Sequence, residues 1–373
     1  MTSGDLVERL VAQHENQLPF IVYRKPNELK VTGLLQNSNQ IFFTEEFTEQ
    51  GFVFSPFDNS RRTVLIPLSQ SERISCSHWD ALSKNENPKS LVSGATNQAK
   101  ETHIKLVDKG VEAIKSGAFK KVVLSRKEEV SLSNNNPITI LNHLLLAYKS
   151  AFVYCWYHPK VGLWLGATPE TLIKKEGRRF SIMALAGTQS YNGTLEVTWK
   201  EKEKQEQQFV TDFIEDQLRP LVETYQISDT ETVKAGNLVH LKTMISAQLK
   251  PDIILKDVID GLHPTPAVCG LPKAEAQRFI LDNENYNREY YSGFLGELNF
   301  ETTIAPRSGR RNIENRAYAM KKNSSQLYVN LRCMQIKDKK GIIYIGGGVT
   351  ESSISEVEWE ETVSKSLVIR KVL

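Results

Sequence analysis

Short apolar runs separated by Gly, Pro, Asn and Asp cover much of the chain, as is typical of β-strands bounded by turns. Near the N-terminus these runs predict an antiparallel meander of strands within 20–25, 31–35, 40–47 and 51–57. Later runs predict strands within 120–132, 152–159, 161–168, 171–176, 179–188, 236–249, 326–336 and 341–348. A hairpin turn is expected at 176–179.

Other segments repeat apolar residues every three to four positions, as amphipathic helices do. They predict helices within 1–20, 101–119, 138–151, 199–225 and roughly 274–282, and one more that begins near 353–355. Because the strands come in antiparallel clusters with helices between them, the expected class is α+β, with large antiparallel sheets packed against helices. We expect one domain over 1–373, with a β-rich part at 1–100 and the motif-bearing part at 101–373. The polar segment 83–98 is predicted to be a surface connection.

The composition supports one large core and excludes several function classes. The chain has 373 residues, of which 40% are hydrophobic and 24% charged. A net charge of +3 is too mild to indicate nucleic acid or membrane, although it favours a small anion. Four scattered cysteines without a CxxC pair predict reduced thiols, and no apolar run reaches transmembrane length. We therefore expect a cytoplasmic monomer or weak oligomer, and a solvated loop in the basic stretch at 301–322.

Residues 342–366, "IIYIGGGVTESSISEVEWEETVSKS", place three glycines between a strand and a glutamate-rich helix. Gly346–Gly348 lack Cβ atoms, so the chain can turn sharply there or a ligand can approach the backbone. A capping box is expected at the start of the helix. It would pair Ser353 with Glu356, or Ser355 with Glu358.

Glu358, Glu361 and Lys365 are spaced i, i+3, i+7 and share one face of that helix. The ordinary interpretation is a solvated face with an i,i+4 ion pair. The functional interpretation is that two carboxylates converge on a hard cation whose anionic ligand faces the glycine backbone. Glu206 shares the buried side of the helix predicted at 199–225, so it either reaches solvent at the helix start or meets a partner such as a metal.

Four further residues allow both an ordinary and a functional interpretation. Lys121 opens a strand and Glu170 follows Pro169, so both could be solvated, while His240 could be a hydrogen-bonded core histidine. Arg332 lies among apolar residues and needs an anion, which a protein carboxylate or a ligand would supply. As a base, Lys121 would need a lowered pKa.

Taken in order, several stretches together resemble the chorismate-utilising enzymes, and among these most closely the isochorismate synthases. The stretches are "KVVLSR", "GATPETL", "LAGT", "KEKQEQQFV", "LVHLKT", "LHPTPAVCG", "LRC", "IGGG" and "EWEETVSK". The resemblance extends from Lys121 to the C-terminus, whereas the N-terminal third is only loosely similar.

The resemblance implies a magnesium-dependent isomerisation of chorismate, in which water adds at ring C2 and hydroxide leaves from C4. It implies that Lys121 is the general base on the water and that Glu170 is the acid that protonates the leaving hydroxyl. His240 would hydrogen-bond the ring substituents.

The resemblance also implies a metal set and a set of substrate contacts. Mg²⁺ would be held by Glu206 and Glu361, with Glu358 bound directly or through water. Arg332 would clamp the enolpyruvyl carboxylate. The substrate would also meet Gly187, Ala267, Gly346, Gly347 and Lys365.

Some positions depart from the family pattern or leave alternatives open. The chain has "KEKQEQ" where relatives often have "KDRxEH", and Ser292 lies in "YSGFLGE" where a Tyr-Gly-Gly run is usual. Ala186 argues against an aminodeoxychorismate synthase, and Lys121 argues against an anthranilate synthase. A salicylate synthase, which goes on to eliminate pyruvate, and a non-catalytic chorismate-binding homologue both stay open. The product could serve menaquinone or a catechol siderophore.

Overall fold

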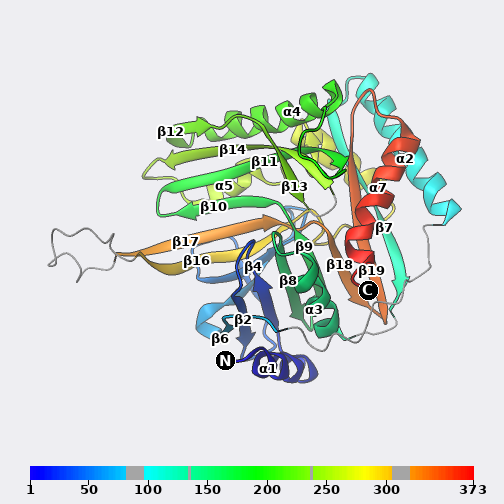
Figure 1. The fold of residues 1–373 in the computed structure, drawn as a ribbon. Coiled ribbons are helices and arrows are strands. Elements are labelled where there is room, and N and C mark those ends of the chain that lie inside the picture. The colour runs from blue at the N-terminus through cyan, green and yellow to red at the C-terminus, as the bar shows by residue number, and fades with distance from the viewer. Residues whose placement is uncertain (81–95, 133–135, 236–237, 305–319) are drawn as a thin grey trace.

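The structure is a computed structural model that describes residues 1–80, 96–132, 136–235, 238–304 and 320–373 (Figure 1). Most of the predicted connection at 83–98 lies outside these residues. So does the basic stretch from 305 to 319, and the predictions for these residues stay untested. At 301–304 and 320–322 the predicted loop is wrong, because these residues belong to strands. In the described residues that flank this stretch, β16 (Phe294–Ile304) and β17 (Met320–Val329) pair as far as Ile304 and Met320.

Nineteen strands in the described residues form two large antiparallel sheets. The nine-stranded sheet has the order β15 (Gly270–Leu271), β7 (Lys121–Ser131), β19 (Lys340–Val349), β18 (Cys333–Lys337), β9 (Gly162–Thr168), β8 (Phe152–His158), β1 (Phe20–Arg24), β2 (Val31–Gln36) and β6 (Ser71–Cys76). The ten-stranded sheet has the order β12 (Val222–Ile227), β14 (Leu238–Leu249), β11 (Arg179–Ser190), β10 (Thr171–Glu176), β17, β16, β4 (Gly51–Ser55), β5 (Thr63–Pro67) and β3 (Phe42–Thr44). A short strand, β13 (Glu231–Ala235), also pairs with β14.

An aromatic core joins the two sheets face to face. In β1, Ile21 and Tyr23 point into this core, whereas Phe20 and Val22 belong to a different core on the opposite face. Phe152 of one sheet stacks on Tyr328 of the other, with ring centroids 4.1 Å apart. Because both faces of β1 are covered, all five of its residues are buried.

Helices cover the outer faces of this sandwich (Figure 1). On the nine-stranded sheet lie α1 (Ser3–Glu15), α3 (Pro137–Ala147) and the end of α7 (Ser355–Arg370). On the ten-stranded sheet lie α4 (Glu201–Leu218) and α5 (Leu255–Leu262), while α2 (Asn97–Lys115) and α6 (Lys273–Asn283) pack against β7. A single 3-10 turn, η1 (Leu68–Gln70), connects β5 to β6. The predicted α+β class with large antiparallel sheets is confirmed.

The N-terminal strands do not form the predicted single meander. β1 and β2 belong to the nine-stranded sheet, whereas β3 and β4 belong to the ten-stranded sheet. The prediction also missed β5, β6, β12, β13, β15, β16 and α5. Apolar alternation marks a strand but not the sheet that it joins, because pairing depends on residues far away in the sequence.

Two predicted elements prove to be too long. The helix expected to continue to 225 ends at Leu218, because Pro220 has no N–H to donate and its ring obstructs a continuing helix. The single strand expected over 326–336 breaks at a corner, where the chain leaves the ten-stranded sheet for the other. Asn330 fixes this corner: it accepts a hydrogen bond from the Tyr154 hydroxyl at 2.6 Å and donates one to the Tyr290 carbonyl at 2.9 Å. Arg332 lies at the corner with φ +48°.

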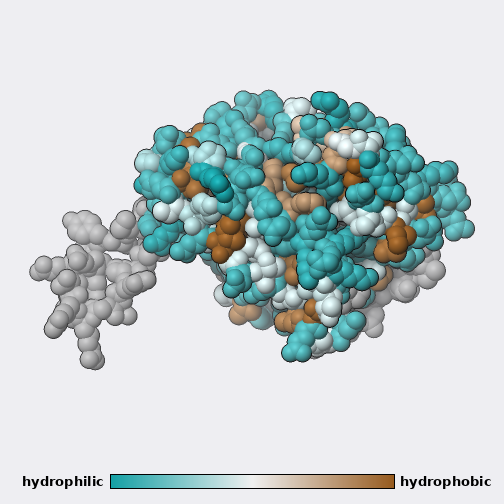
Figure 2. Space-filling view, turned by 90° about the horizontal axis from the view of Figure 1, so that it is seen from above, coloured by the Kyte–Doolittle hydropathy of each residue, from teal (hydrophilic) through white to brown (hydrophobic). Residues whose placement is uncertain are grey.

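The described surface is mixed rather than extensively apolar. Figure 2 shows one mainly hydrophilic face on which apolar residues are scattered in small groups. In the described ranges, no helix combines the length and the apolar character that crossing a bilayer requires. The four cysteines are buried free thiols, as predicted.

Candidate active site

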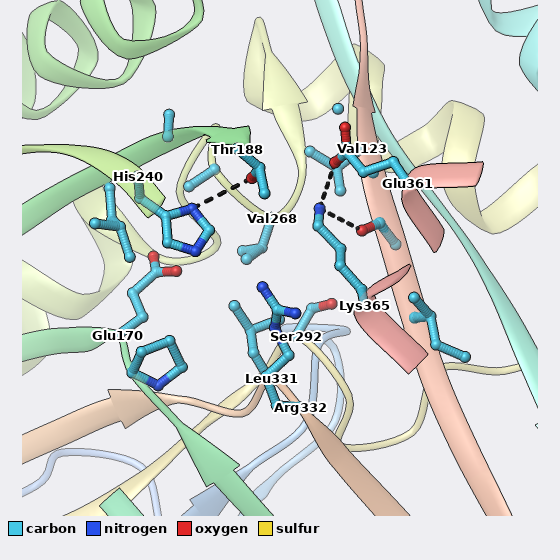
Figure 3. Close-up of a pocket in the computed structure, with 18 of the residues that line it drawn as sticks. Val123, Glu170, Thr188, His240, Val268, Ser292, Leu331, Arg332, Glu361 and Lys365 are labelled. Atoms are coloured by element: carbon cyan, nitrogen blue, oxygen red, sulfur yellow. Dashed lines mark hydrogen bonds and ion pairs between the residues drawn. The ribbon is translucent and has the colours of Figure 1, made fainter. Parts of the chain in front are cut away.

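One pocket gathers nearly all the residues that the sequence singled out, from elements far apart along the chain. The predicted residues that line it are Glu170, Gly187, Glu206, His240, Ala267, Arg332, Gly346, Gly347, Glu361 and Lys365. The remaining two, Lys121 and Glu358, are buried directly behind its wall. In Figure 3, Glu170 and His240 lie on one side, Glu361 and Lys365 lie on the other, and Arg332 lies between them.

Glu170 follows β9 and has a carboxyl group suited to proton donation. Its side chain is buried, and its backbone is fixed by hydrogen bonds with Thr168 and Val329. Burial raises the pKa of Glu170 to about 7, against the opposing positive charges of Lys121, Arg332 and Lys365. A carboxyl group with such a pKa is partly protonated near neutral pH, as a general acid must be.

His240 of β14 presents an acceptor atom to the pocket. Its Nδ1 lies 2.9 Å from the Gly187 carbonyl oxygen and 3.2 Å from Thr188 Oγ1. Because a carbonyl oxygen can only accept, Nδ1 carries the proton and donates to it. Burial, helped by the charge of Arg332, lowers the pKa of His240 to about 3, so the ring is neutral. Its Nε2 therefore has a free lone pair, which is buried and has no hydrogen-bond partner among the described residues.

Gly187 can accept this bond because it lies where the pairing of β11 with β14 shifts register. Its φ of +68° is one that a residue with a Cβ rarely adopts. A methyl group there would lie 3.1 Å from the Glu203 side chain. Gly187 thus orients His240 and allows α4 to approach β11 closely.

The three glycines at 346–348 lie in a strand, as predicted for 341–348, and make no sharp turn. Gly346, Gly347 and Gly348 continue β19 and pair with Ser125, Leu124 and Val123 of β7. On the other side, β18 pairs with β19 only as far as Ile343. The glycine backbone therefore has a partner strand on one side and faces the pocket on the other, so the prediction of close ligand approach stays open.

Three carboxylates border this glycine backbone. A methyl group at Gly347 would lie 3.6 Å from Glu361 Oε1 and 3.8 Å from Glu358 Oε2. A methyl group at Gly348 would collide with Glu206 Oε1. The space that glycine leaves open is thus bordered by hard oxygen atoms from α4 and α7, which are the ligands that Mg²⁺ prefers. The donor set fits a magnesium ion.

Each of these glutamates is paired with a lysine. Lys121 Nζ lies 2.9 Å from Glu206 Oε1, Lys365 Nζ lies 2.6 Å from Glu361 Oε1, and Lys202 forms a short ion pair with Glu358. Burial raises the pKa of Glu206, but the charge of Lys121 and its hydrogen bond outweigh this, and the pKa ends below its usual value. While the glutamates are paired with these lysines, no three metal-ligating side chains among the described residues are grouped closely enough to hold a metal ion.

The predicted capping box of α7 is wrong. The helix begins at Ser355 with Ile354 as its N-cap, and no side chain caps it. Ser353 Oγ accepts from the Thr350 backbone instead, and Ser355 donates to Asp108 of α2. The predicted shared face is confirmed, since Lys365 pairs with Glu361 and also donates to the Gly346 carbonyl at 3.0 Å.

Arg332 points a free donor into the pocket. Its Nη1 is buried without a hydrogen-bond partner among the described residues, and burial lowers its pKa. Tyr291, Glu361 and Glu170 oppose this lowering of the pKa. An unsatisfied buried guanidinium is costly, so this position is suited to an anionic ligand.

The sequence interpretation missed two residues of this site. Lys202 lies one helical turn before Glu206, and this spacing was the only signal for it. Tyr291 lines the pocket beside Gly346, and a methyl group at Gly346 would lie 2.8 Å from the Tyr291 hydroxyl. The contact of Lys202 with Glu358 and that of Tyr291 with Gly346 each join segments that are distant in sequence, so local sequence patterns do not reveal them.

Most of the chain is similar to known proteins. The family described as chorismate binding enzyme matches residues 59–373. The isochorismate synthase of Pasteurella multocida is 28% identical over 334 residues, which are 85% of this chain and 70% of that protein. The isochorismate synthase of Bacillus subtilis is 26% identical over 69% of this chain and 64% of its own length.

The fold is shared with a solved structure. The menaquinone-specific isochorismate synthase of Escherichia coli superimposes with a TM-score of 0.74 and 20% identity, covering 95% of this chain and 88% of that one. At this identity the likeness shows the fold alone. The family match begins after β4 and includes every residue of the pocket. The chain belongs to the family of chorismate binding enzymes.

Proposed function

We propose that this protein is an isochorismate synthase that uses Mg²⁺ to isomerise chorismate. The observation that carries the proposal is one pocket lined by Glu206, Glu361 and the buried Glu170 carboxyl group, with Lys121 and Glu358 directly behind its wall. The isochorismate synthases among its relatives support the assignment.

The free cationic donors suit a dianionic substrate. The partnerless Nη1 of Arg332 would bind the enolpyruvyl carboxylate, since a guanidinium matches a carboxylate in geometry and charge. Glu206 and Glu361, with Glu358 directly or through water, would hold Mg²⁺, whose positive charge would offset that of the ring carboxylate. The acceptor Nε2 of His240 would take a hydrogen bond from a ring hydroxyl and so orient it.

The reaction requires one proton acceptor and one proton donor. As water forms its bond to C2, the Lys121 amine takes the water's proton. The two ring double bonds shift by one position, and the C4–O bond breaks. Glu170 donates its proton to the departing C4 oxygen, which leaves as water. Lys121 has to leave its ion pair with Glu206 before it can act as the base.

The assay that tests this function uses chorismate and Mg²⁺, with the products separated by chromatography. Isochorismate as the sole product supports the proposal. Salicylate with pyruvate would instead identify a salicylate synthase, and unchanged chorismate would indicate a binding homologue without catalysis. Whether the product serves menaquinone or a catechol siderophore stays a prediction.

The Glu361→Ala variant tests the metal site. This substitution removes one of the three oxygen donors over Gly347, so we expect half-maximal activity at a much higher Mg²⁺ concentration. The measurement is a magnesium titration of the initial rate. Glu360→Ala, a change at an exposed neighbour on the same helix, is the matched control and should titrate like the wild type. An unaltered titration for Glu361→Ala would count against the site.

The pH dependence tests the acid. Because burial raises the pKa of Glu170 to about 7, the donor is protonated below this pH and loses its proton above it. Because Lys121 must also lose its proton, the two titrations act together, and we expect the slope of log(kcat/KM) against pH to decrease by one unit as the pH rises through about 7. A profile whose slope does not change near pH 7 would mean that Glu170 is not the proton donor.

A further inference from the structure

Lys202 of α4 is the cation nearest to Glu358, and the proposed mechanism does not use it. Its ammonium group forms a short ion pair with Glu358 Oε1. Lys202 lies four residues before Glu206 on the same face of α4, and the charges of Glu206 and Glu361 also act on it. Lys202 therefore faces the carboxylates that we assign to the metal.

Glu358 depends on this lysine for charge compensation. The side chain is 2% exposed, and its second oxygen, Oε2, is buried beside Gly347 with no hydrogen-bond partner among the described residues. Burial raises the pKa of Glu358, and the charge of Lys202 opposes this rise. A buried carboxylate without a partner is strongly destabilising.

The three lysine–glutamate pairs leave the site formally neutral, with three positive and three negative charges. A divalent cation that enters this array must compete with ammonium groups already bound to its ligands. Lys121 is assigned to catalysis, and Lys365 also holds the Gly346 carbonyl. The Lys202 side chain is 28% exposed, so its ammonium group can move from Glu358 into solvent.

We propose that Lys202 is the internal counter-ion of the metal site. Its ammonium group neutralises Glu358 while no metal is bound, and it moves away from Glu358 when a divalent cation binds. Lys202 is thus a positioning residue that stabilises the metal-free protein and weakens its affinity for Mg²⁺. The inference rests on the proposed magnesium site.

Lys202→Met tests this idea, because methionine keeps most of the apolar stem and removes the charge. We expect the metal-free variant to unfold at a lower temperature than the wild type. We also expect it to bind Mg²⁺ at least about tenfold more tightly in isothermal titration calorimetry. Magnesium should therefore raise its unfolding temperature more than it raises that of the wild type. A merely structural lysine would instead give weaker Mg²⁺ binding when removed.

Two further variants make the result specific. Lys204→Met, on the same helix but in an exposed pair with Glu201, should change neither unfolding nor Mg²⁺ affinity. Lys202→Met combined with Glu358→Gln removes both charges. It should recover the metal-free stability and lose the gain in affinity.

The outcomes separate the inference from the proposed function. If the wild type binds Mg²⁺ and Lys202→Met binds it equally or more weakly, the counter-ion role is wrong while the metal site stands. If neither protein binds Mg²⁺, the metal site itself is wrong and the inference is overturned with it.

Discussion

Lys121→Arg should fold and lose turnover by at least about 10²–10⁴-fold, the usual contribution of a general base. Lys121 is fully buried at the start of β7, with Nζ 2.9 Å from Glu206. Arginine can keep this ion pair, but its guanidinium does not lose a proton in proteins. The variant therefore separates the charge of Lys121 from its capacity to accept a proton from water.

The measurement is kcat with saturating chorismate and Mg²⁺, beside a circular dichroism spectrum. Lys121→Met, which removes the charge as well, should be equally inactive. Lys120→Arg, a change at the exposed neighbour, is the matched control and should keep wild-type turnover. Turnover of the Lys121→Arg variant within a few fold of the wild type would exclude the lysine base.

Glu170→Gln should lower kcat by about 10²–10⁴-fold, because the amide keeps the shape of the protonated carboxyl group but is a very weak acid. Binding should change little, since the neutral amide resembles the neutral acid. The pH profile of the residual activity should also lose the change of slope near pH 7 that the titration of Glu170 causes. The measurements are kcat and KM across this pH range.

Glu176→Gln supplies the control for this variant. Glu176 ends β10, close to Glu170 in sequence, but its side chain is 47% exposed and paired with Lys174. Its replacement should leave kcat and the pH profile intact. Should Glu170→Gln retain a normal kcat, or keep the same pH profile, another group must protonate the leaving hydroxyl.

The sequence predicts the elements of this fold better than their arrangement. Most strands and helices were located correctly because alternation and helical periodicity are local properties. The division of the N-terminal strands between two sheets, and the corner at Asn330, depend on contacts across the core. Asn330 was a usable signal, since a polar residue inside an apolar run needs buried partners, and Tyr154 and Tyr290 provide them.

For the site, the sequence predicts the participants but not their pairings. Glu206, Glu358 and Glu361 were expected to face one another, and the structure brings all three to the glycine strand. Of their lysine partners, only Lys365 was indicated, by its i,i+4 spacing from Glu361. The ion pairs of Lys121 and Lys202 each join two separate elements, so the local sequence does not indicate them. Of the two possibilities raised for the glycines, a sharp turn does not occur, because they continue β19. They do leave open space beside the backbone, and the three carboxylates border it.

The central claim is that the site adds solvent water to C2 of chorismate while the C4 oxygen leaves. The most direct test is turnover of chorismate with Mg²⁺ in water enriched in oxygen-18, followed by mass spectrometry and NMR of the product. We predict isochorismate with one heavy oxygen, located in the C2 hydroxyl. Isochorismate without the label would mean that the original hydroxyl migrates, and that the roles assigned to Lys121 and Glu170 are wrong.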